Sequence, residues 1–228
     1  METTLEVRWF VRGTPPLVVQ HWFRLECMGN FKGWETRKDW YAYPRSSFSD
    51  RLDEFLPNLK PEEINLKLRQ NNLELKIRRP LENSGLANIK SSISGKIEQW
   101  HKFDERELRD AAIFKNPPAK IDWISVDKKR EQKIKQGVKS ELTWLKINHE
   151  SWWTIAFEMT QNDEKYQYSR FKKIVETVCQ TYPDPQLSNS NSYGYSRWLL
   201  KFAPQAIDKD SILVDEQPDL SSKKFFIH

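Results

Sequence analysis

The sequence predicts an α+β protein, mainly of antiparallel β-strands, in which eight strands close into a barrel that surrounds a tunnel. Segments with alternating apolar and charged residues recur between residues 4 and 160, and short turns separate most of them. A large antiparallel sheet usually closes or folds on itself, because an open edge leaves backbone groups unpaired. The apolar faces carry large side chains, which require cover from helices on the outside. The charged faces are therefore expected to line the inside of the barrel.

The clearest element is a β-hairpin over residues 63–79, with the sequence EINLKLRQNNLELKIRR. Apolar and polar residues alternate on both sides of Asn71-Asn72, so each strand has one apolar and one charged face. Asparagine tolerates the positive φ of a tight hairpin turn, which places the turn at Asn71-Asn72. The polar faces of the two strands carry Asn65, Lys67, Arg69, Glu74, Lys76 and Arg78.

The other elements follow from the same patterns along the chain. Alternation predicts strands over residues 4–12, 36–44, 94–103, 120–134, 139–148 and 151–160. Residues 13–35 are expected to hold a loop or short helix, and residues 80–93 a polar linker. Capping residues, helix formers and apolar spacing predict helices over residues 47–57, 104–114, 166–182 and 193–203. We expect residues 1–203 to form one domain, with peripheral helices and two C-terminal helices, and residues 204–228 to be a weakly ordered tail.

The composition suits one soluble domain with a sizeable core. The chain has 228 residues, of which 38% are hydrophobic and 30% charged, and ten Trp and twelve Phe contribute to the core. A net charge of +5 and a pI near 9.0 suit an anionic ligand, but they also suit any soluble protein. Cys27 and Cys179 lack metal-ligand spacing, and no stretch approaches the roughly 20 apolar residues that cross a bilayer. With no recognisable signal peptide, we expect a cytoplasmic protein without a membrane partner.

If the sheet closes, the charged faces of its strands converge inside. Seven basic residues would then meet four acidic ones, which is unfavourable unless the charges pair or meet a ligand. This excess fits a polyanion, with a divalent cation held by the carboxylates. An open antiparallel sheet with one solvated face gives the same alternation, and in that alternative the charges contact only water. The converging residues are Glu6, Arg8, Lys67, Arg69, Glu74, Lys76, Arg78, Lys96, Glu98, Lys102 and Glu158.

Several of these residues together resemble the CYTH, or triphosphate tunnel metalloenzyme, superfamily. The resemblance rests on the LEVRWF strand, the basic residues of KLRQNNLELKIRR, Glu98, Glu158 and the C-terminal SNSYGYSRWLL, and it spans residues 4–203. It implies an eight-stranded antiparallel tunnel that binds triphosphate compounds with Mg²⁺ or Mn²⁺. Members of the family include inorganic and thiamine triphosphatases, RNA triphosphatases and class IV adenylyl cyclases.

The resemblance also implies roles for individual residues. As catalytic residues it implies Glu6, Arg69 and Lys76, and as metal ligands Glu6, Glu98 and Glu158. On the sixth strand, Lys129 or Arg130 would supply the basic residue. The phosphate-binding residues that it implies are Arg8, Lys67, Arg69, Lys76, Arg78, Lys96 and Lys129.

The chain departs from the family signature at two places. The Glu-x-Glu-x-Lys of the first strand is here Thr4-x-Glu6-x-Arg8, and Ala156 stands where a second glutamate of the last strand is expected. Because Mg²⁺ is held by few direct protein ligands, the loss of two carboxylates weakens the metal site more than the phosphate site. Anion binding is therefore better supported than turnover.

Three functions are compatible with these features. The first is a metal-dependent phosphohydrolase that acts on tripolyphosphate or on a nucleoside or other organic triphosphate. The second is a non-catalytic module on the same fold that binds polyphosphate or a nucleotide. The third is a structural protein with solvated charged faces, in which the basic run at residues 127–135 could contact nucleic acid. We expect an anionic small molecule as the partner rather than nucleic acid, and the sequence leaves the oligomeric state open.

Overall fold

The computed structural model describes residues 2–44, 58–70, 72–81, 86–90, 92–103, 107, 121–161, 164–183 and 185–203. The helix predicted over residues 47–57 and the tail predicted over residues 204–228 lie outside these ranges. Of the helix predicted over residues 104–114, only residue 107 is described. These three predictions therefore stay untested.

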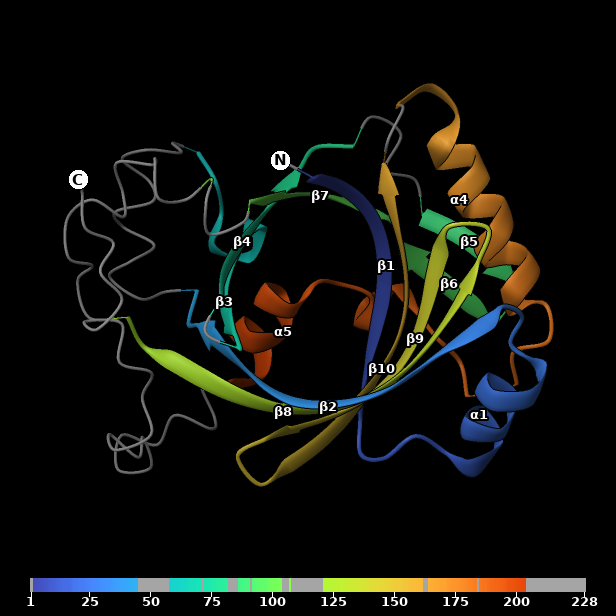
Figure 1. Ribbon diagram of the computed structural model, residues 1–228, viewed down its shortest axis with the longest axis horizontal. Helices are drawn as coiled ribbons and strands as arrows, with labels where there is room; N and C mark the ends of the chain where they lie inside the picture. Colours follow the sequence, from blue (N-terminus) through green and yellow to red (C-terminus); the bar gives the residue numbers. More distant parts are fainter. Residues whose placement is uncertain are drawn as a thin grey trace.

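Eight antiparallel strands form a closed barrel, which confirms the predicted fold class (Figure 1). Around the barrel the strands follow the order β1-β10-β9-β8-β2-β3-β4-β7, and β7 pairs with β1 to close it. Closure gives each strand of the barrel a neighbour on both sides, although β3 pairs with only Asp39–Tyr41 of the longer β2. The strands are β1 (Glu2–Arg12), β2 (Asn30–Ala42), β3 (Ile64–Arg69), β4 (Asn72–Arg79), β7 (Glu98–Phe103), β8 (Trp123–Lys135), β9 (Val138–Ile147) and β10 (Glu150–Gln161).

The predicted hairpin is present as β3 and β4, but its turn lies one residue earlier than expected. Leu68 pairs with Leu73 and Arg69 pairs with Asn72, so Asn72 belongs to the strand and the turn begins at Gln70. Gln70 has the positive φ of 47°. The register follows the apolar faces, because shifting it by one residue would expose every buried leucine of the hairpin.

Two further segments differ from the sequence prediction. β2 begins at Asn30 rather than near residue 36, and it follows the short helix α1 (Leu17–His21) and the π-helical turn η1 (Trp22–Glu26). The predicted linker over residues 80–93 contains the strand β5 (Leu86–Lys90). β5 pairs with β6 (Ile93–Lys96) in a separate two-stranded sheet.

β6 and β7 were predicted as one strand, but the chain leaves the barrel between them at Ile97, which is buried in the core. The backbone of β6 packs on the ring of Trp9, whose Nε1 donates a hydrogen bond of 2.8 Å to the Ser94 carbonyl. A methyl group at Gly95 would lie 2.5 Å from this ring, so only glycine allows the close approach. This packing holds β6 outside the barrel, over β1.

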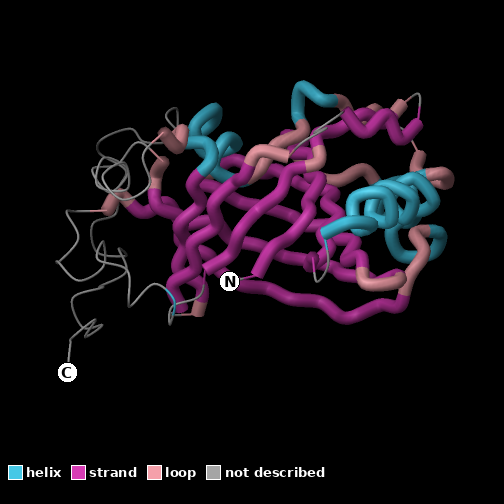
Figure 2. Tube along the Cα trace, turned by 90° about the horizontal axis from the view of Figure 1, so that it is seen from above, coloured by secondary structure: helices cyan, strands magenta, loops and turns pink. Residues whose placement is uncertain are grey.

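The largest hydrophobic core lies outside the barrel, between the strands and a layer of helices. The long helix α4 (Glu164–Cys179) covers the outer faces of β9 and β10, with β5 and β6 beside it (Figures 1 and 2). Its apolar residues at helical spacing meet those that point outward from the strands. Among the residues of this core are Leu5, Val7, Trp9, Leu142, Ile155, Phe157, Phe171, Val175 and Val178.

A second apolar cluster fills one end of the barrel, around the C-terminal helix α5 (Tyr195–Phe202). Phe10 points inward from β1 and stacks between Tyr193 and Trp198, with ring centroids 5.5 and 5.0 Å apart. Ser196 donates a hydrogen bond of 2.6 Å to the Ile64 carbonyl, which ties α5 to β3. In Figure 1 α5 lies within the ring of strands. Short 3₁₀ turns η2 (Pro61–Glu63) and η4 (Asn189–Asn191) complete the described elements.

No helix in the described part of the chain is both long and apolar enough to cross a membrane.

Candidate functional site

The polar faces of the barrel strands enclose a cavity of about 220 Å³. Nine basic and five acidic side chains line this partly enclosed space, and Asp39 and Glu35, which contact the lining Arg37, reduce the excess of positive formal charges from four to two. All eight barrel strands contribute charged residues to this lining, so the charged faces do converge instead of facing bulk water. The basic residues are Arg8, Arg37, Lys67, Arg69, Lys76, Lys102, Lys128, Arg130 and Lys139, and the acidic residues are Glu2, Glu6, Glu74, Glu141 and Glu158.

One side of the site, from β2, β3 and β8, is rich in basic groups gathered around Asp39. The Asp39 carboxylate is fully buried and lies 3.0 Å from Lys128 Nζ, 3.0 Å from Arg37 Nε and 3.4 Å from Arg69 Nε. Burial alone would raise the pKa of Asp39, but Lys128 and Arg37 outweigh it and hold that pKa well below its usual range. Asp39 is therefore a fixed anion that organises three cations.

Two lysines on this side are deeply buried. Lys67 lies 3.0 Å from Glu74, and Lys128 lies over the Tyr195 ring, 3.8 Å from its centroid. Burial lowers the pKa of both lysines to about 7, with Arg69 adding to the effect at Lys67 and Arg37 at Lys128. Their carboxylate partners, Glu74 and Asp39, only partly oppose this shift. Both lysines therefore change charge near neutral pH.

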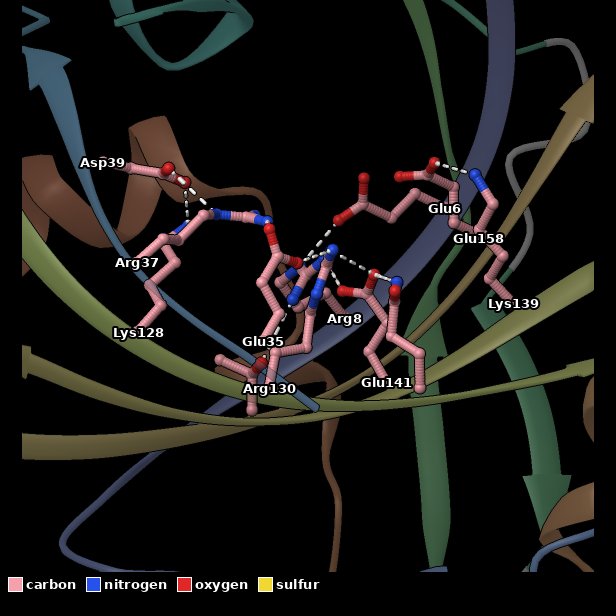
Figure 3. A network of polar contacts seen from close by, with 12 residues as sticks. Glu6, Arg8, Glu35, Arg37, Asp39, Lys128, Arg130, Lys139, Glu141 and Glu158 are labelled. Atoms are coloured by element: carbon pink, nitrogen blue, oxygen red, sulfur yellow. Dashed lines mark hydrogen bonds and ion pairs between the residues drawn. The ribbon is translucent and has the colours of Figure 1, made fainter. Parts of the chain in front are cut away.

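The opposite side, from β7, β1 and β10, carries a row of three carboxylates. Glu6 is the register partner of both Glu98 and Glu158, so the three lie side by side on neighbouring strands. Like charges directly opposite each other on a sheet are destabilising unless cations separate them. Arg8 Nε contacts Glu6 at 2.6 Å, Lys76 Nζ contacts Glu158 at 3.3 Å, and Arg78 contacts Glu98 at 3.1 Å. Figure 3 shows Arg8 beside Glu6 and Glu141, and Lys139 beside Glu158.

Arg8 also reaches past β10 to β9. It pairs in register with Ala156, which pairs in turn with Glu141, and Arg8 spans this row to contact Glu141 Oε2 at 3.3 Å. It also donates a hydrogen bond of 3.1 Å to Thr154 Oγ1. The small side chain of Ala156 leaves the space that the guanidinium crosses. Burial by itself would raise the pKa of Glu141. The positive charges of Arg8 and Arg130 have the larger effect and lower that pKa to about 2.

These carboxylates do not fit a resident divalent cation as they are arranged. Among the residues that the structure describes, no group of three or more His, Cys, Asp or Glu side chains is placed to hold a metal ion. Each acid of the row contacts a basic side chain instead. Magnesium is usually held by one or two protein carboxylates together with water and phosphate oxygens, and here Arg8 and Lys76 contact the carboxylates that would be its protein ligands. We therefore assign no chemical step to a bound metal.

Six of the residues implied by the resemblance line the cavity, and four do not. Arg78 and Glu98 pair with each other at its margin, where Arg78 also contacts Glu63 at 2.8 Å. Lys96 is exposed on β6, outside the barrel, because the chain leaves the sheet at Ile97. Lys129 is exposed on the outer face of β8, over the rings of Trp34 and Trp144, and the alternative Arg130 faces the cavity. The six lining residues are Glu6, Arg8, Lys67, Arg69, Lys76 and Glu158.

The sequence reasoning missed a second set of lining residues. On β2, Arg37 lies between the exposed Thr36 and Lys38, and on β9 Lys139, Glu141 and Thr143 alternate with residues of the outer core such as Val138 and Leu142. That alternation was a usable signal in both strands. Lys128 and Tyr195 gave no such signal, since one lies in a continuous charged run and the other at the start of a helix.

Comparisons with protein-family models and with curated protein sequences find no match to this chain. Solved structures do match. A Hippeastrum protein, described as a "putative adenylyl cyclase" with "a dominant triphosphatase activity", is 12% identical with a TM-score of 0.52; the alignment covers 89% of this chain and 96% of that one. A conserved hypothetical protein from Pyrococcus furiosus is 14% identical over 85% of this chain and 98% of that one, with a TM-score of 0.45. The likeness to the Hippeastrum structure supports the tunnel fold that the family resemblance implied.

Proposed function

We propose that the barrel binds a linear phosphate chain, either tripolyphosphate or the triphosphate group of a nucleotide or another organic molecule. The observation that carries the proposal is the convergence of nine basic side chains on one partly enclosed cavity, with a net excess of two positive formal charges once Asp39 and Glu35 are counted. Buried charges of one sign are costly unless a ligand of the opposite sign compensates them. A linear polyanion satisfies several basic groups at once, which a single carboxylate or sulfate does not.

The basic side of the site would supply most of the phosphate contacts. Arg37 and Arg69 present planar guanidinium groups, which can form paired hydrogen bonds to phosphate oxygens. Lys67 and Lys128 add ammonium groups from the neighbouring strands β3 and β8. Asp39 and Glu74 hold these four cations in place before the anion arrives, so little ordering is left for the binding step.

Adjacent lysines on β8 give a matched test of this proposal. Lys128 lines the cavity, whereas Lys129 is exposed outside the barrel, so Lys128→Met and Lys129→Met remove the same charge on opposite sides of one strand. We expect Lys128→Met to weaken tripolyphosphate binding by about tenfold or more, the typical loss for one charged hydrogen bond. Lys129→Met should leave the affinity within about twofold. Isothermal titration calorimetry at pH 6.5 measures both.

Equal losses in the two variants would contradict binding inside the barrel, because they would reflect the net charge alone. Lys67→Met provides an independent variant on a different strand, and it should behave like Lys128→Met. Thermal unfolding of each variant shows whether the fold is retained, since Lys128→Met leaves Arg37 and Arg69 on the buried Asp39.

Hydrolysis of the bound anion is a second candidate function. It is favoured by Glu6 and Glu158, which face the same cavity as the basic residues, and by the likeness in fold to the Hippeastrum protein described as a triphosphatase. Phosphate release from tripolyphosphate and nucleoside triphosphates, with and without Mg²⁺ or Mn²⁺, tests it. We expect any release to be lost in Arg69→Ala. If the unmodified protein released no more phosphate than Arg69→Ala from any substrate of the panel, hydrolysis would be ruled out and only the binding function would remain.

A further inference from the structure

We propose that the tunnel takes up its phosphate chain as the free anion, without a divalent cation, because Arg8 and Lys76 already neutralise the carboxylates that would hold one. The inference rests on the proposed function and specifies the ionic form of its ligand. It departs from the Mg²⁺ or Mn²⁺ requirement that the family resemblance implies.

Lys76 lies between two carboxylates on neighbouring strands, those of Glu6 and Glu158. It extends from β4, across β7, to lie 3.3 Å from Glu158 and 3.6 Å from Glu6. Those two acids are direct partners in register on β1 and β10. A single ammonium group thus lies between two facing carboxylates, where a bridging cation would otherwise bind. Although burial lowers the pKa of Lys76, Glu158 and Glu6 outweigh it and raise that pKa, so the lysine stays charged.

Arg8 fills the neighbouring position. Its guanidinium contacts Glu6, Thr154 and Glu141, which come from three different strands. This span depends on Ala156, whose methyl group is fully buried beneath it. A glutamate at position 156 would bring a further carboxylate between Glu6 and Glu141. In this chain an arginine holds the adjoining acids together instead.

The charges of the cavity favour the same conclusion. Around the carboxylate row, four acids from β1, β9 and β10 and four bases from β1, β4, β8 and β9 balance one another in formal charge, so no net negative charge is left to attract a dication. A dication added to a cavity with an excess of positive charge would meet repulsion from Lys76 and Arg8. A metal-bound phosphate chain also offers fewer free oxygens and less negative charge to the basic side. The acids and bases counted here are Glu2, Glu6, Glu141, Glu158, Arg8, Lys76, Arg130 and Lys139.

Calorimetric titration with tripolyphosphate, once in EDTA and once in excess Mg²⁺, tests the proposal. We expect saturable binding in EDTA and several-fold weaker binding in Mg²⁺, since the metal competes with the lysines and arginines for the same oxygens. Mn²⁺ alone, followed by electron paramagnetic resonance, should keep the signal of the free ion when the protein is added. Binding of tripolyphosphate only in Mg²⁺, or uptake of Mn²⁺ by the unmodified protein, would overturn the inference.

A pair of lysine variants sharpens the test. Lys76→Met removes the ammonium group between Glu6 and Glu158, and we expect this variant to take up Mn²⁺. Lys102→Met removes another cavity lysine, one that lies near Glu2 and Glu74, and it should not take up Mn²⁺. Mn²⁺ uptake by neither variant would show that Lys76 does not occupy a cation position. Absence of tripolyphosphate binding in both EDTA and Mg²⁺ would instead remove the proposed function itself.

Discussion

Replacing Trp198 with alanine is expected to lower the free energy of unfolding by about 3–5 kcal/mol, as is usual when a fully buried tryptophan is truncated. Trp198 is completely buried in α5, stacks on Phe10 and packs edge-on against Trp152. The variant would leave a large cavity in the cluster that fills one end of the barrel. Denaturation in urea, followed by circular dichroism, measures the loss.

Trp34→Ala is the matched control for this prediction. Trp34 is 51% exposed on β2, where it contacts Arg24 and Lys129 through its ring. Its removal should cost no more than about 1 kcal/mol, the scale of exposed cation–π contacts. If both variants lost the same stability, α5 would not be an integral part of the barrel.

Affinity for a phosphate chain is expected to fall as the pH rises from 6 to 8. Burial lowers the pKa of Lys67 and Lys128 to about 7, so both are mostly charged at pH 6 and mostly neutral at pH 8. An anion binds the charged forms, so the affinity is highest well below pH 7 and falls as the pH rises above it. Each lysine contributes about tenfold across this range if the bound state keeps both protons. Calorimetry at pH 6, 7 and 8 measures the slope.

The ligand's own ionisation works against this slope, because tripolyphosphate becomes more negative as the pH rises. The double variant Lys67→Met, Lys128→Met separates the two effects, since it should bind weakly with an affinity that rises or stays level with pH. Titration at pH 7 in two buffers with different ionisation enthalpies should also show proton uptake by the unmodified protein. A slope unchanged in the double variant would rule out these lysines as its origin.

Much of the candidate site was readable from alternation, where apolar residues fix which face of a strand is buried. In β1, Leu5, Val7 and Trp9 mark the outer face, which leaves Glu6 and Arg8 inside. The same reasoning placed Lys67, Lys76 and Glu158 correctly, because their strands carry regular leucine, isoleucine or aromatic neighbours. It failed in the run from Asp127 to Lys133, because charged side chains occupy both faces of the strand and do not indicate which face points into the barrel.

The sequence by itself thus determined the eight antiparallel strands, the helices α4 and α5 and the charged inner faces of several strands, since local periodicity carries that information. Only the tertiary structure decided that Lys128 faces inward while Lys129 faces outward, through the pairing of β8 with β2 and β9. It also decided that Arg8 meets Glu141, 133 positions away in the chain, across the buried methyl group of Ala156. Such contacts depend on strand order and barrel closure, which local periodicity does not record. These long-range contacts hold the basic side chains in place and neutralise the carboxylates of the site.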